Sequence, residues 1–555
     1  MYLYKTIFCL LVLLALGCKT STQQPPLEET FSDASTPFVW ENANIYFLLT
    51  DRFNNGDPAN DLAFERQPDG APLRYFMGGD LKGITQKIQE GYFSDLGITA
   101  IWMTPFVEQI HSYTDEGTGK TYGFHGYWAR DWTSVDPNFG TEADLAEMIT
   151  TAHEHGIRIL MDAVLNHTGP VTPVDTQWPR TWVRTSPKCD FKNYRGTISC
   201  TLVENLPDIR TESDEAVVLP AFLTEKWKAE GRLEQELKEL DDFFARTAYP
   251  RAARFYLIKW LTDWVAKYGI DGFRVDTAKH TEESVWTELK KEASLAFNAW
   301  KKQHPEAKLD EQDFFMTGEV YGYGIHSGRL YDFGDQQVDF FDHGFQSLIN
   351  FAFKYDAQKS PEKIFSSYSD RLNSSEWKGL SVLNYLSSHD DAEPFDKERT
   401  KTFETGTKLL LSPGAAQVYY GDETARPLNI AEAQGDAKLR SFMNWEDAQS
   451  SELLTHWQKL GQFRRDHISV GAGVHEQLQK SPYIFKRSYD KNGLRDRVLV
   501  AMNLPQDESS KTIKVFGVFP EGTKVRDYYS GQTSTVTDGK LRFDTKASML
   551  LVGEI

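Results

Sequence analysis

The segment GFRVDTAKH, residues 272–280, places an arginine and an aspartate two positions apart at the end of an apolar run. Side chains two positions apart on a β-strand point to the same face, so Arg274 and Asp276 should lie side by side. A fixed cation beside a carboxylate keeps it ionised, as a nucleophile requires. The alternative interpretation is a buried ion pair that closes the strand without any chemistry.

Other acidic residues end other apolar runs of the chain. Asp276 ends the fourth such run, Glu319 the fifth and Asp390 the seventh. If the runs are parallel strands of one barrel, these carboxyls meet at one rim and raise one another's pKa. Hydrolysis of a glycosidic bond needs such a set, with one proton donor beside one ionised carboxylate. Metal coordination is the competing explanation.

Eight apolar runs alternate along the chain with amphipathic helical patterns. One helical pattern, TEADLAEMITTAHEHG, begins with a capping-box-like pair, Thr141 and Asp144. This alternation predicts an α/β fold, a closed parallel (β/α)8 TIM barrel with buried strands and a catalytic C-terminal rim. The predicted strands are NIYFLLTDRF from Asn44, ITAIWMTP from Ile98, IRILMDAVLNH from Ile157, GFRVD from Gly272, FFMTGEV from Phe314, QVDFFD from Gln337, LSVLNYLSSHD from Leu380 and QVYYGDE from Gln417.

Two parts of the chain depart from this alternation. Residues 168–250 are too many for an ordinary loop and predict an inserted domain after strand three. Beyond residue 470, short alternating runs between Gly, Asn and Asp turns predict a C-terminal antiparallel β-sandwich domain. The predicted organisation is a signal peptide at 1–18, a flexible tether at 19–38, the barrel at 39–167 and 251–470, the inserted domain at 168–250 and the β domain at 471–555.

Six segments resemble, in order, the signature regions of the α-amylase family, glycoside hydrolase family 13. DAVLNH, GFRVDTAKH, GEV and SSHD end strands three, four, five and seven, while GFHGYW follows strand two and YYGDE follows strand eight. The segments KKEASLAFNAWKK, MTGEVYGYG and FDHGFQSLINF resemble more closely the periplasmic, maltodextrin-acting α-amylases of Gram-negative bacteria. The resemblance implies retaining hydrolysis of α-1,4-glucosidic bonds in starch, maltodextrins and related α-glucans.

The resemblance also implies roles for individual residues. Asp276 would be the nucleophile, Glu319 the general acid and base, and Asp390 the carboxylate that holds sugar hydroxyls. A retaining mechanism places the first two carboxyls about 5–5.5 Å apart. The residues implied to bind the sugar are His125, Tyr127, His167, Arg274, Lys279, His280 and His389.

Three other functions stay open. One is a transglycosylase such as a cyclodextrin glucanotransferase, and another is a pullulan- or cyclodextrin-cleaving hydrolase of the neopullulanase and cyclomaltodextrinase type. The third is a catalytically inactive glucan-binding protein, which the presence of all three acids disfavours. Ser388 stands where many family members have Asn, whereas Lys279 with His280 favours α-1,4 chains.

Two calcium sites are predicted. The segments NNGDPAND and GGD provide closely spaced hard oxygen ligands, which suit Ca²⁺ rather than zinc, although an Asx-rich loop without metal is the alternative. By resemblance to cyclodextrin glucanotransferases, the first site would use Asn55, Asp57, Asn60, Asp61, the Gly78 carbonyl and Asp80. The second site would use Asn166, Asp208 and the His280 carbonyl.

The N-terminus and the cysteines predict export. An apolar run ends in LALGC, which resembles a bacterial lipoprotein signal that would make Cys18 the lipidated first residue, although an ordinary secretory signal is the alternative. Cys189 and Cys200 predict a disulfide in an oxidising compartment, with two buried thiols as the alternative. We expect a periplasmic or outer-membrane lipoprotein of a Gram-negative bacterium.

Charge restricts the partners of the protein. The net charge of -19 disfavours nucleic acid, and a neutral α-glucan is the expected ligand. We expect a monomer whose contact with membranes is made only through the lipid anchor.

Overall fold

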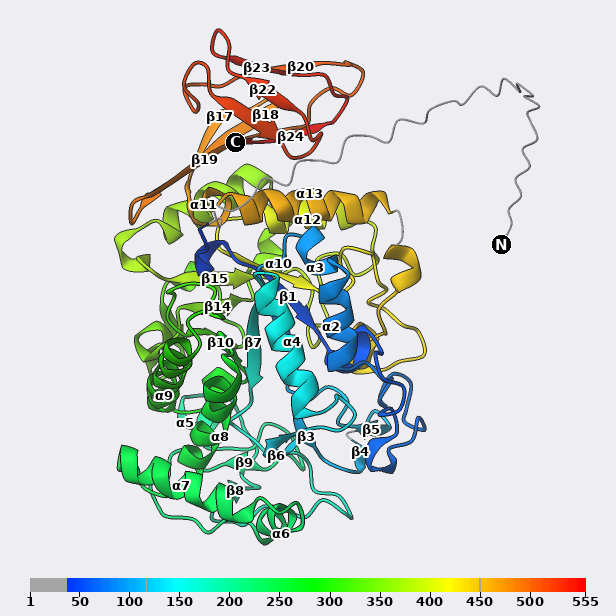
Figure 1. Ribbon diagram of the computed structural model, residues 1–555, viewed down its shortest axis with the longest axis vertical. Coiled ribbons are helices and arrows are strands. Elements are labelled where there is room, and N and C mark those ends of the chain that lie inside the picture. Colours follow the sequence, from blue (N-terminus) through cyan, green and yellow to red (C-terminus); the bar gives the residue numbers. More distant parts are fainter. Residues whose placement is uncertain (1–36, 116, 449–450) are drawn as a thin grey trace, which may run out of the picture. The chain divides into compact units, whose positions relative to one another are not determined.

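A computed structural model describes residues 37–115, 117–448 and 451–555 (Figure 1). The predicted signal peptide, most of the tether and the lipidation site Cys18 lie outside these residues, so they stay predictions. Among the helices of the described residues, none combines the length and apolar character that crossing a membrane requires.

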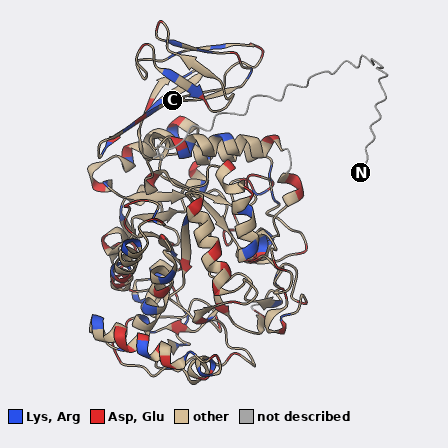
Figure 2. Ribbon diagram, viewed as in Figure 1, with Lys and Arg blue, Asp and Glu red and all other residues tan. Residues whose placement is uncertain are grey.

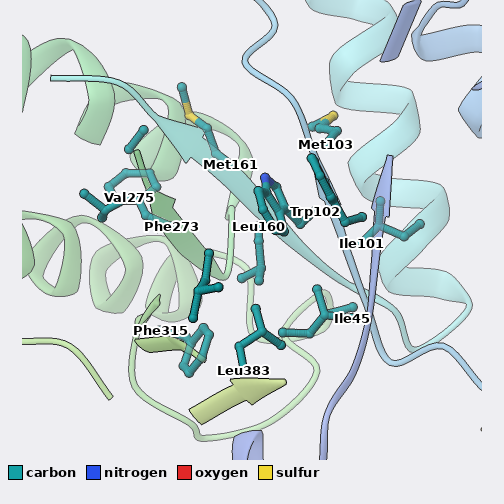
Figure 3. Packing of buried hydrophobic residues seen from close by; sticks show 14 of the residues in the cluster. Ile45, Ile101, Trp102, Met103, Leu160, Met161, Phe273, Val275, Phe315 and Leu383 are labelled. Carbon is teal, nitrogen blue, oxygen red and sulfur yellow. The ribbon is translucent and has the colours of Figure 1, made fainter. Parts of the chain in front are cut away.

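Eight parallel strands close into a barrel in the order β1, β2, β7, β10, β11, β14, β15 and β16, with β16 paired to β1. Their side chains are buried, and Figure 3 shows some of them, among them Ile45, Leu160, Phe273 and Leu383. The predicted (β/α)8 barrel is therefore confirmed. The strands are β1 Asn44–Leu48, β2 Ala100–Met103, β7 Arg158–Ala163, β10 Gly272–Val275, β11 Phe315–Gly318, β14 Ser347–Asn350, β15 Ser381–Asn384 and β16 Ala415–Tyr419.

The sixth predicted strand is wrong. QVDFFD contributes β13 (Gln337–Asp339), which pairs antiparallel with β12 (Leu330–Asp332) outside the barrel, and the sixth barrel strand is β14. All four residues of β14 are buried, whereas Gln337 is exposed and Asp339 only partly buried. A barrel strand is covered on both faces, so QVDFFD lacks the apolar character that this position requires.

Helices connect most of the barrel strands and cover the barrel. The predicted capping box of α4 is present, because Thr141 and Asp144 each accept a hydrogen bond from the other's backbone N–H. Residues 319–346, all of them described, connect β11 to β14 without an α-helix. The longer barrel helices are α2 Leu81–Gln89, α4 Glu142–Glu154, α8 Ala253–Tyr268, α9 Glu283–Gln303, α11 Pro361–Leu372, α12 Thr402–Leu410 and α13 Glu452–Asp466.

Shorter helices and hairpins decorate the barrel. The short helices are α1 Thr50–Phe53, α3 Tyr92–Asp95, α10 Phe353–Asp356 and α14 Ser469–Ala472. Between β2 and α4, β3 (Val107–Gln109) pairs with β6 (Ala129–Val135), and β4 (Tyr113–Asp115) pairs with β5 (Lys120–Tyr122).

The insertion between β7 and α8 is built from short elements and a charged helix. The sulfur atoms of Cys189 and Cys200 are bonded within it. Figure 2 shows basic and acidic residues alternating along α7, where Lys238 Nζ lies 2.6 Å from Asp242 Oδ2. The elements are β8 Val183–Arg184, α5 Arg195–Ile198, β9 Asp208–Ile209, α6 Ala221–Ala229 and α7 Leu233–Thr247.

The C-terminal part is an antiparallel β domain, as predicted. Its six-stranded sheet has the order β17, β18, β19, β24, β21, β22, and β20 pairs with β23 in a second sheet. Buried side chains of both sheets, such as Leu499 and Phe543, form one cluster. The strands are β17 Val474–Gln479, β18 Tyr483–Lys491, β19 Leu494–Met502, β20 Lys511–Lys514, β21 Lys524–Asp527, β22 Thr533–Thr535, β23 Lys540–Phe543 and β24 Met549–Glu554.

Candidate active site

The register of three barrel strands brings the predicted catalytic residues together. Arg274 of β10 pairs with Asp162 of β7 on one side and with Thr317 of β11 on the other. Side chains in register on parallel strands share a face, so the next residues on that face, Asp276 and Glu319, emerge beside one another. The predicted contact between Arg274 and Asp276 is present, with Nη1 2.8 Å from Asp276 Oδ1.

Arg274 contacts three carboxylates at once. Its Nη1 lies 2.9 Å from Asp162 Oδ1, and its Nη2 lies 2.9 Å from Glu319 Oε2. Arg274, Asp162, Asp276 and Glu319 are all buried. One buried guanidinium therefore holds Asp162 and two of the three predicted catalytic acids, Asp276 and Glu319, at one point of the rim.

The environment of Glu319 suits a proton donor. Burial raises the pKa of Glu319 to about 8, since Arg274 offsets only part of this effect and the charges of Asp276 and Asp390 add to it. The backbone N–H of Thr277 donates to Glu319 Oε2 over 2.9 Å. Near neutral pH, the carboxyl of Glu319 is therefore largely protonated.

Asp390 lies at the more open side of this cluster. It is exposed, unlike Asp276 and Glu319, and its Oδ1 lies 3.7 Å from His389 Nδ1. Although 36% of the side chain is exposed, the protein packed around the carboxyl group removes part of its water and raises the pKa of Asp390, and Arg274 opposes that effect. Its exposed side chain can reach a hydroxyl group of a bound sugar.

Aromatic side chains surround the carboxyl groups. Tyr127 donates its hydroxyl to Asp162 Oδ2 over 2.8 Å, and its ring stacks on His389 with centroids 5.2 Å apart. His167 Nε2 lies 3.1 Å from the Tyr127 carbonyl. Burial lowers the pKa of His125, His167 and His389, so these imidazoles are neutral near pH 7. A neutral imidazole has one donor and one acceptor nitrogen, as hydroxyl groups require.

Lys279 and His280 connect this cluster to other loops. Lys279 Nζ donates to the Tyr321 carbonyl over 3.0 Å and lies 3.2 Å from the Tyr331 hydroxyl. His280 Nδ1 lies 3.0 Å from the carbonyl of Thr197 in the insertion. Burial lowers the pKa of His280 to about 4, so its ring is neutral. His280 therefore ties the insertion to the end of β10.

A second charged group near the histidines was not predicted from the sequence. Arg440 donates from Nε to the His389 carbonyl over 2.9 Å, and its Nη2 lies 2.7 Å from Asp436 Oδ2. Arg74 Nη2 lies 2.8 Å from Asp436 Oδ1. Burial favours a higher pKa for Asp436, but Arg440 and Arg74 outweigh it and lower the pKa to about 2. The only signal in the sequence was an Asp and an Arg four positions apart, in GDAKLR, outside any periodic pattern.

Comparison with known proteins identifies the family. The model of the α-amylase catalytic domain matches residues 47–470. The chain belongs to the α-amylase family. It is 37% identical over 533 residues to the periplasmic alpha-amylase of Escherichia coli (strain K12), covering 85% of this chain and 74% of that protein.

More distant relatives of this α-amylase family member include a transferase and a solved structure. The cyclomaltodextrin glucanotransferase of Thermoanaerobacterium thermosulfurigenes is 25% identical over 499 residues, covering 86% of this chain and 62% of that protein. The crystal structure of the Geobacillus thermoleovorans α-amylase complexed with acarbose has a TM-score of 0.64 at 21% identity, covering 94% of this chain and 99% of that one. The latter shows that the fold is shared.

The first predicted calcium site of this α-amylase family member has oxygen atoms without partners. Asn55 Oδ1 and Asn60 Oδ1 are buried and accept no hydrogen bond, and Asn55 Nδ2 donates to Asp61 Oδ1 over 3.0 Å. A Cβ atom at Gly78 would lie 2.6 Å from Asp61 Oδ1, so only glycine allows this close approach. Unpaired amide oxygens beside a carboxylate fit Ca²⁺.

Two other predicted ligands of the first site already have partners. Asp80 accepts from the backbone N–H groups of Asp57 and Gly83, over 2.8 Å and 2.6 Å, and caps α2. Asp57 Oδ2 lies 2.5 Å from Lys82 Nζ. Asp80 is thus held by backbone N–H groups and Asp57 by Lys82.

The second predicted set also comes together. The side-chain oxygen of Asn166 faces the His280 carbonyl oxygen at 2.8 Å and Asp208 Oδ1 at 3.2 Å, so the three oxygens need either a cation between them or an Asn166 amide turned by half a rotation, whose nitrogen would donate to both. Arg184 Nε lies 2.7 Å from Asp208 Oδ2 and compensates its charge. No cluster of three or more His, Cys, Asp or Glu side chains suited to a metal occurs in residues 37–115, 117–448 and 451–555. Both predicted sites depend on amide and carbonyl oxygens instead.

Proposed function

We propose that this protein is an α-amylase that hydrolyses α-1,4-glucosidic bonds in starch and maltodextrins with retention of anomeric configuration. The contact of one buried guanidinium, that of Arg274, with both Asp276 and Glu319 carries this proposal. The raised pKa of Glu319 provides the proton donor, and the contact of Asp276 Oδ1 with Arg274 Nη1 places Asp276 beside it as the nucleophile. The names of the relatives support the same reaction and substrate class.

In the proposed first step, Asp276 attacks the anomeric carbon as the bond to the leaving oxygen breaks. Glu319 gives its proton to that oxygen, and a glycosyl ester of Asp276 forms. In the second step, Glu319 takes a proton from a water molecule whose oxygen attacks the anomeric carbon and releases Asp276. Asp390 holds hydroxyl groups of the same sugar ring.

The aromatic and imidazole groups position this sugar ring. Tyr127 offers its ring as a stacking face, and His125, His167 and His389 hydrogen-bond its hydroxyl groups. Lys279, which lies beside the exposed ring of Tyr321, contacts the leaving part of the chain.

A transglycosylase is the second candidate function. Tyr321, two residues after Glu319, is exposed and offers a ring on which an acceptor sugar can stack in competition with water. Product analysis on maltoheptaose, cyclodextrin and pullulan separates the candidates. Hydrolysis predicts short linear products from maltoheptaose whose new reducing ends are first seen by NMR as the α-anomer, whereas transfer predicts cyclic or longer products. Initial β-anomer would contradict retention, and no cleavage of any substrate would favour an inactive binding protein.

We also propose one bound Ca²⁺, held by Asn55, Asn60, Asp61, the Gly78 carbonyl and Asp80. The two unpaired amide oxygens support it. The ion stabilises the loop between β1 and α2 and takes no part in the proton transfers.

Finally, we propose that the protein is exported and works as a monomer attached to a membrane through lipid on Cys18. The sequence LALGC, the cysteine pair and the name of the Escherichia coli relative support this location. Replacement Cys18→Ser should move active enzyme from the membrane pellet to the soluble fraction. Wild-type enzyme that is already soluble and carries no lipid by mass spectrometry would contradict the anchor.

A further inference from the structure

An open cleft shares no lining residue with the candidate active site. Its volume is about 510 Å³, within the range of ligand-binding clefts. It lies between residues 64–66, which belong to the same loop as the first predicted calcium site, and the hairpin of β4 and β5. The lining residues are Phe64, Glu65, Arg66, His111, Ser112, Tyr113, Tyr122 and Val174.

Two exposed aromatic rings form the walls of this cleft. Phe64 is 38% exposed, although one face of its ring stacks on His111 with centroids 3.8 Å apart. Tyr113 is 46% exposed, with Lys120 Nζ 4.0 Å from the centre of its ring. Each ring therefore keeps surface on which the ring of a ligand can stack.

The backbone around the cleft is held in place. Phe64 and Glu65 have φ angles of 53° and 56°, in the left-handed region that bulky residues seldom adopt. Asp175 accepts from the backbone N–H groups of His111 and Ser112 over 2.9 Å and 3.0 Å. Strained residues cluster at functional sites, and a fixed wall binds a ligand at a lower entropy cost.

The cations in and beside the cleft are already compensated. Arg66 Nη1 lies 2.7 Å from Asp136 Oδ1, and Lys120 Nζ lies 2.5 Å from Asp69 Oδ2. Neither cation is thus available for an anionic ligand, and Glu65 is the only acid among the lining residues. Exposed rings beside a hydroxyl and an imidazole instead suit a neutral, polyhydroxylated ring.

One strand that lines the cleft lies a few residues before a residue of the candidate active site. Tyr122 ends β5 and lines the cleft, and His125 follows three positions later. The N–H of Tyr122 donates to the Arg74 carbonyl over 2.9 Å, while the Arg74 side chain binds Asp436. The strand that lines the cleft therefore leads directly into the segment that carries His125, and the backbone beside the cleft is hydrogen-bonded to that of Arg74.

We propose that this cleft is a second, noncatalytic binding site for polymeric α-glucan, with Phe64 and Tyr113 as its stacking platforms. This inference rests on the proposed function. The site would raise the residence time of the enzyme on starch and would leave short maltooligosaccharides unaffected.

The test compares retardation by soluble starch in native gels with cleavage of maltotriose. Replacing Phe64→Ala and Tyr113→Ala together should weaken starch binding roughly tenfold, while kcat/KM on maltotriose changes less than about twofold. Tyr113→Phe should bind as wild type. The matched control is Phe403→Ala on α12, a ring that is 47% exposed outside the cleft, and it should bind starch normally.

Each outcome of this test decides the proposal. Unchanged starch binding by the folded double variant, or wild-type protein that starch does not retard, overturns the second site. If Phe64→Ala lowers the melting temperature, the single variant Tyr113→Ala is used to test starch binding instead. Tyr113 lies on an exposed hairpin strand, so its replacement should not disturb the fold. Wild-type enzyme that cleaves neither maltotriose nor starch would instead contradict the proposed function, whatever the variants bind.

Discussion

The rim of the barrel and the loop that holds the first predicted calcium site both bury polar oxygen atoms, but they satisfy them differently. At the rim, Arg274 contacts three carboxyl groups. In the loop, the side-chain oxygens of Asn55 and Asn60 are buried without a partner. A buried polar atom without a hydrogen bond is costly, which supports the proposal that a bound ion completes the loop. The carboxyl groups of the rim are thus held by the chain itself, whereas the proposed order of the loop depends on a ligand.

Replacing the nucleophile at the rim should have the largest effect. We expect Asp276→Asn to lower kcat on maltoheptaose by roughly 10⁴-fold or more, because an amide cannot form the glycosyl ester. The melting temperature should change little, since the amide keeps the size of the carboxylate. Turnover near that of wild type, in a preparation free of contaminating amylase, would refute the assignment of Asp276.

Removing the cation should disrupt the whole rim. Arg274→Met leaves the carboxyl groups of Asp162 and Asp276 buried without a cation, and we expect the free energy of unfolding to fall by about 3–5 kcal/mol. Urea unfolding at pH 7 measures this loss. Arg464→Met is the control. It removes a buried arginine of the same size that contacts carbonyl groups but no carboxylate, so it measures the loss of stability that comes from the smaller side chain and the lost hydrogen bonds alone. A loss at Arg274 that does not shrink on acidification would argue against the carboxylates as its cause.

The raised pKa of Glu319 predicts two dependences on pH. The alkaline limb of kcat/KM should fall as the pH rises towards 8, where Glu319 loses the proton that it donates. The folded state also binds this proton more tightly than the unfolded state, so the contribution of Glu319 to stability should decline between about pH 4.5 and 8. Glu319→Gln should remove both this decline and the activity. If the free energy of unfolding changes with pH in the same way for wild type and for Glu319→Gln between about pH 4.5 and 8, the pKa of Glu319 is not raised.

The smallest effect is expected at the loop. Excess chelator should lower the melting temperature of wild-type enzyme by about 5 °C, because Ca²⁺ bound only by the folded state stabilises it by mass action. Asn55→Ala should start from the lower temperature and no longer respond to chelator, while Asp276→Asn should respond as wild type does. Equal melting curves with and without chelator, and no calcium by elemental analysis, would show that the loop is complete without a metal.

The sequence allowed the barrel and its rim to be predicted because strand ends that are distant in sequence converge at one edge. Asp276, Glu319 and Asp390 each follow a short apolar run, so their meeting followed from the fold class. The prediction of QVDFFD as strand six is wrong because its aromatic residues give it the apolar character of a buried strand, while the true strand, SLIN, is shorter and has polar residues at both ends.

The Asp436 and Arg440 pair could not be found in the same way. It lies in an irregular segment after β16, and its neighbours Arg74 and His389 come from distant parts of the chain. Periodic patterns carry no information about such a segment, since its position depends on tertiary contacts. The roles of the sugar-binding residues remain predictions for a different reason: they depend on a bound ligand as well as on the fold of the chain.

The single guanidinium at the rim has a consequence for the flow of protons. Three carboxyl groups share one positive charge, and burial raises the pKa of Asp162 to about 6 and that of Glu319 to about 8, so the empty enzyme already carries the hydrogen ion that the first bond cleavage consumes. The attacking water returns an equivalent ion to Glu319 before the sugar leaves. Each catalytic cycle therefore closes without exchange with the surrounding solution, and the turnover number should be independent of buffer concentration.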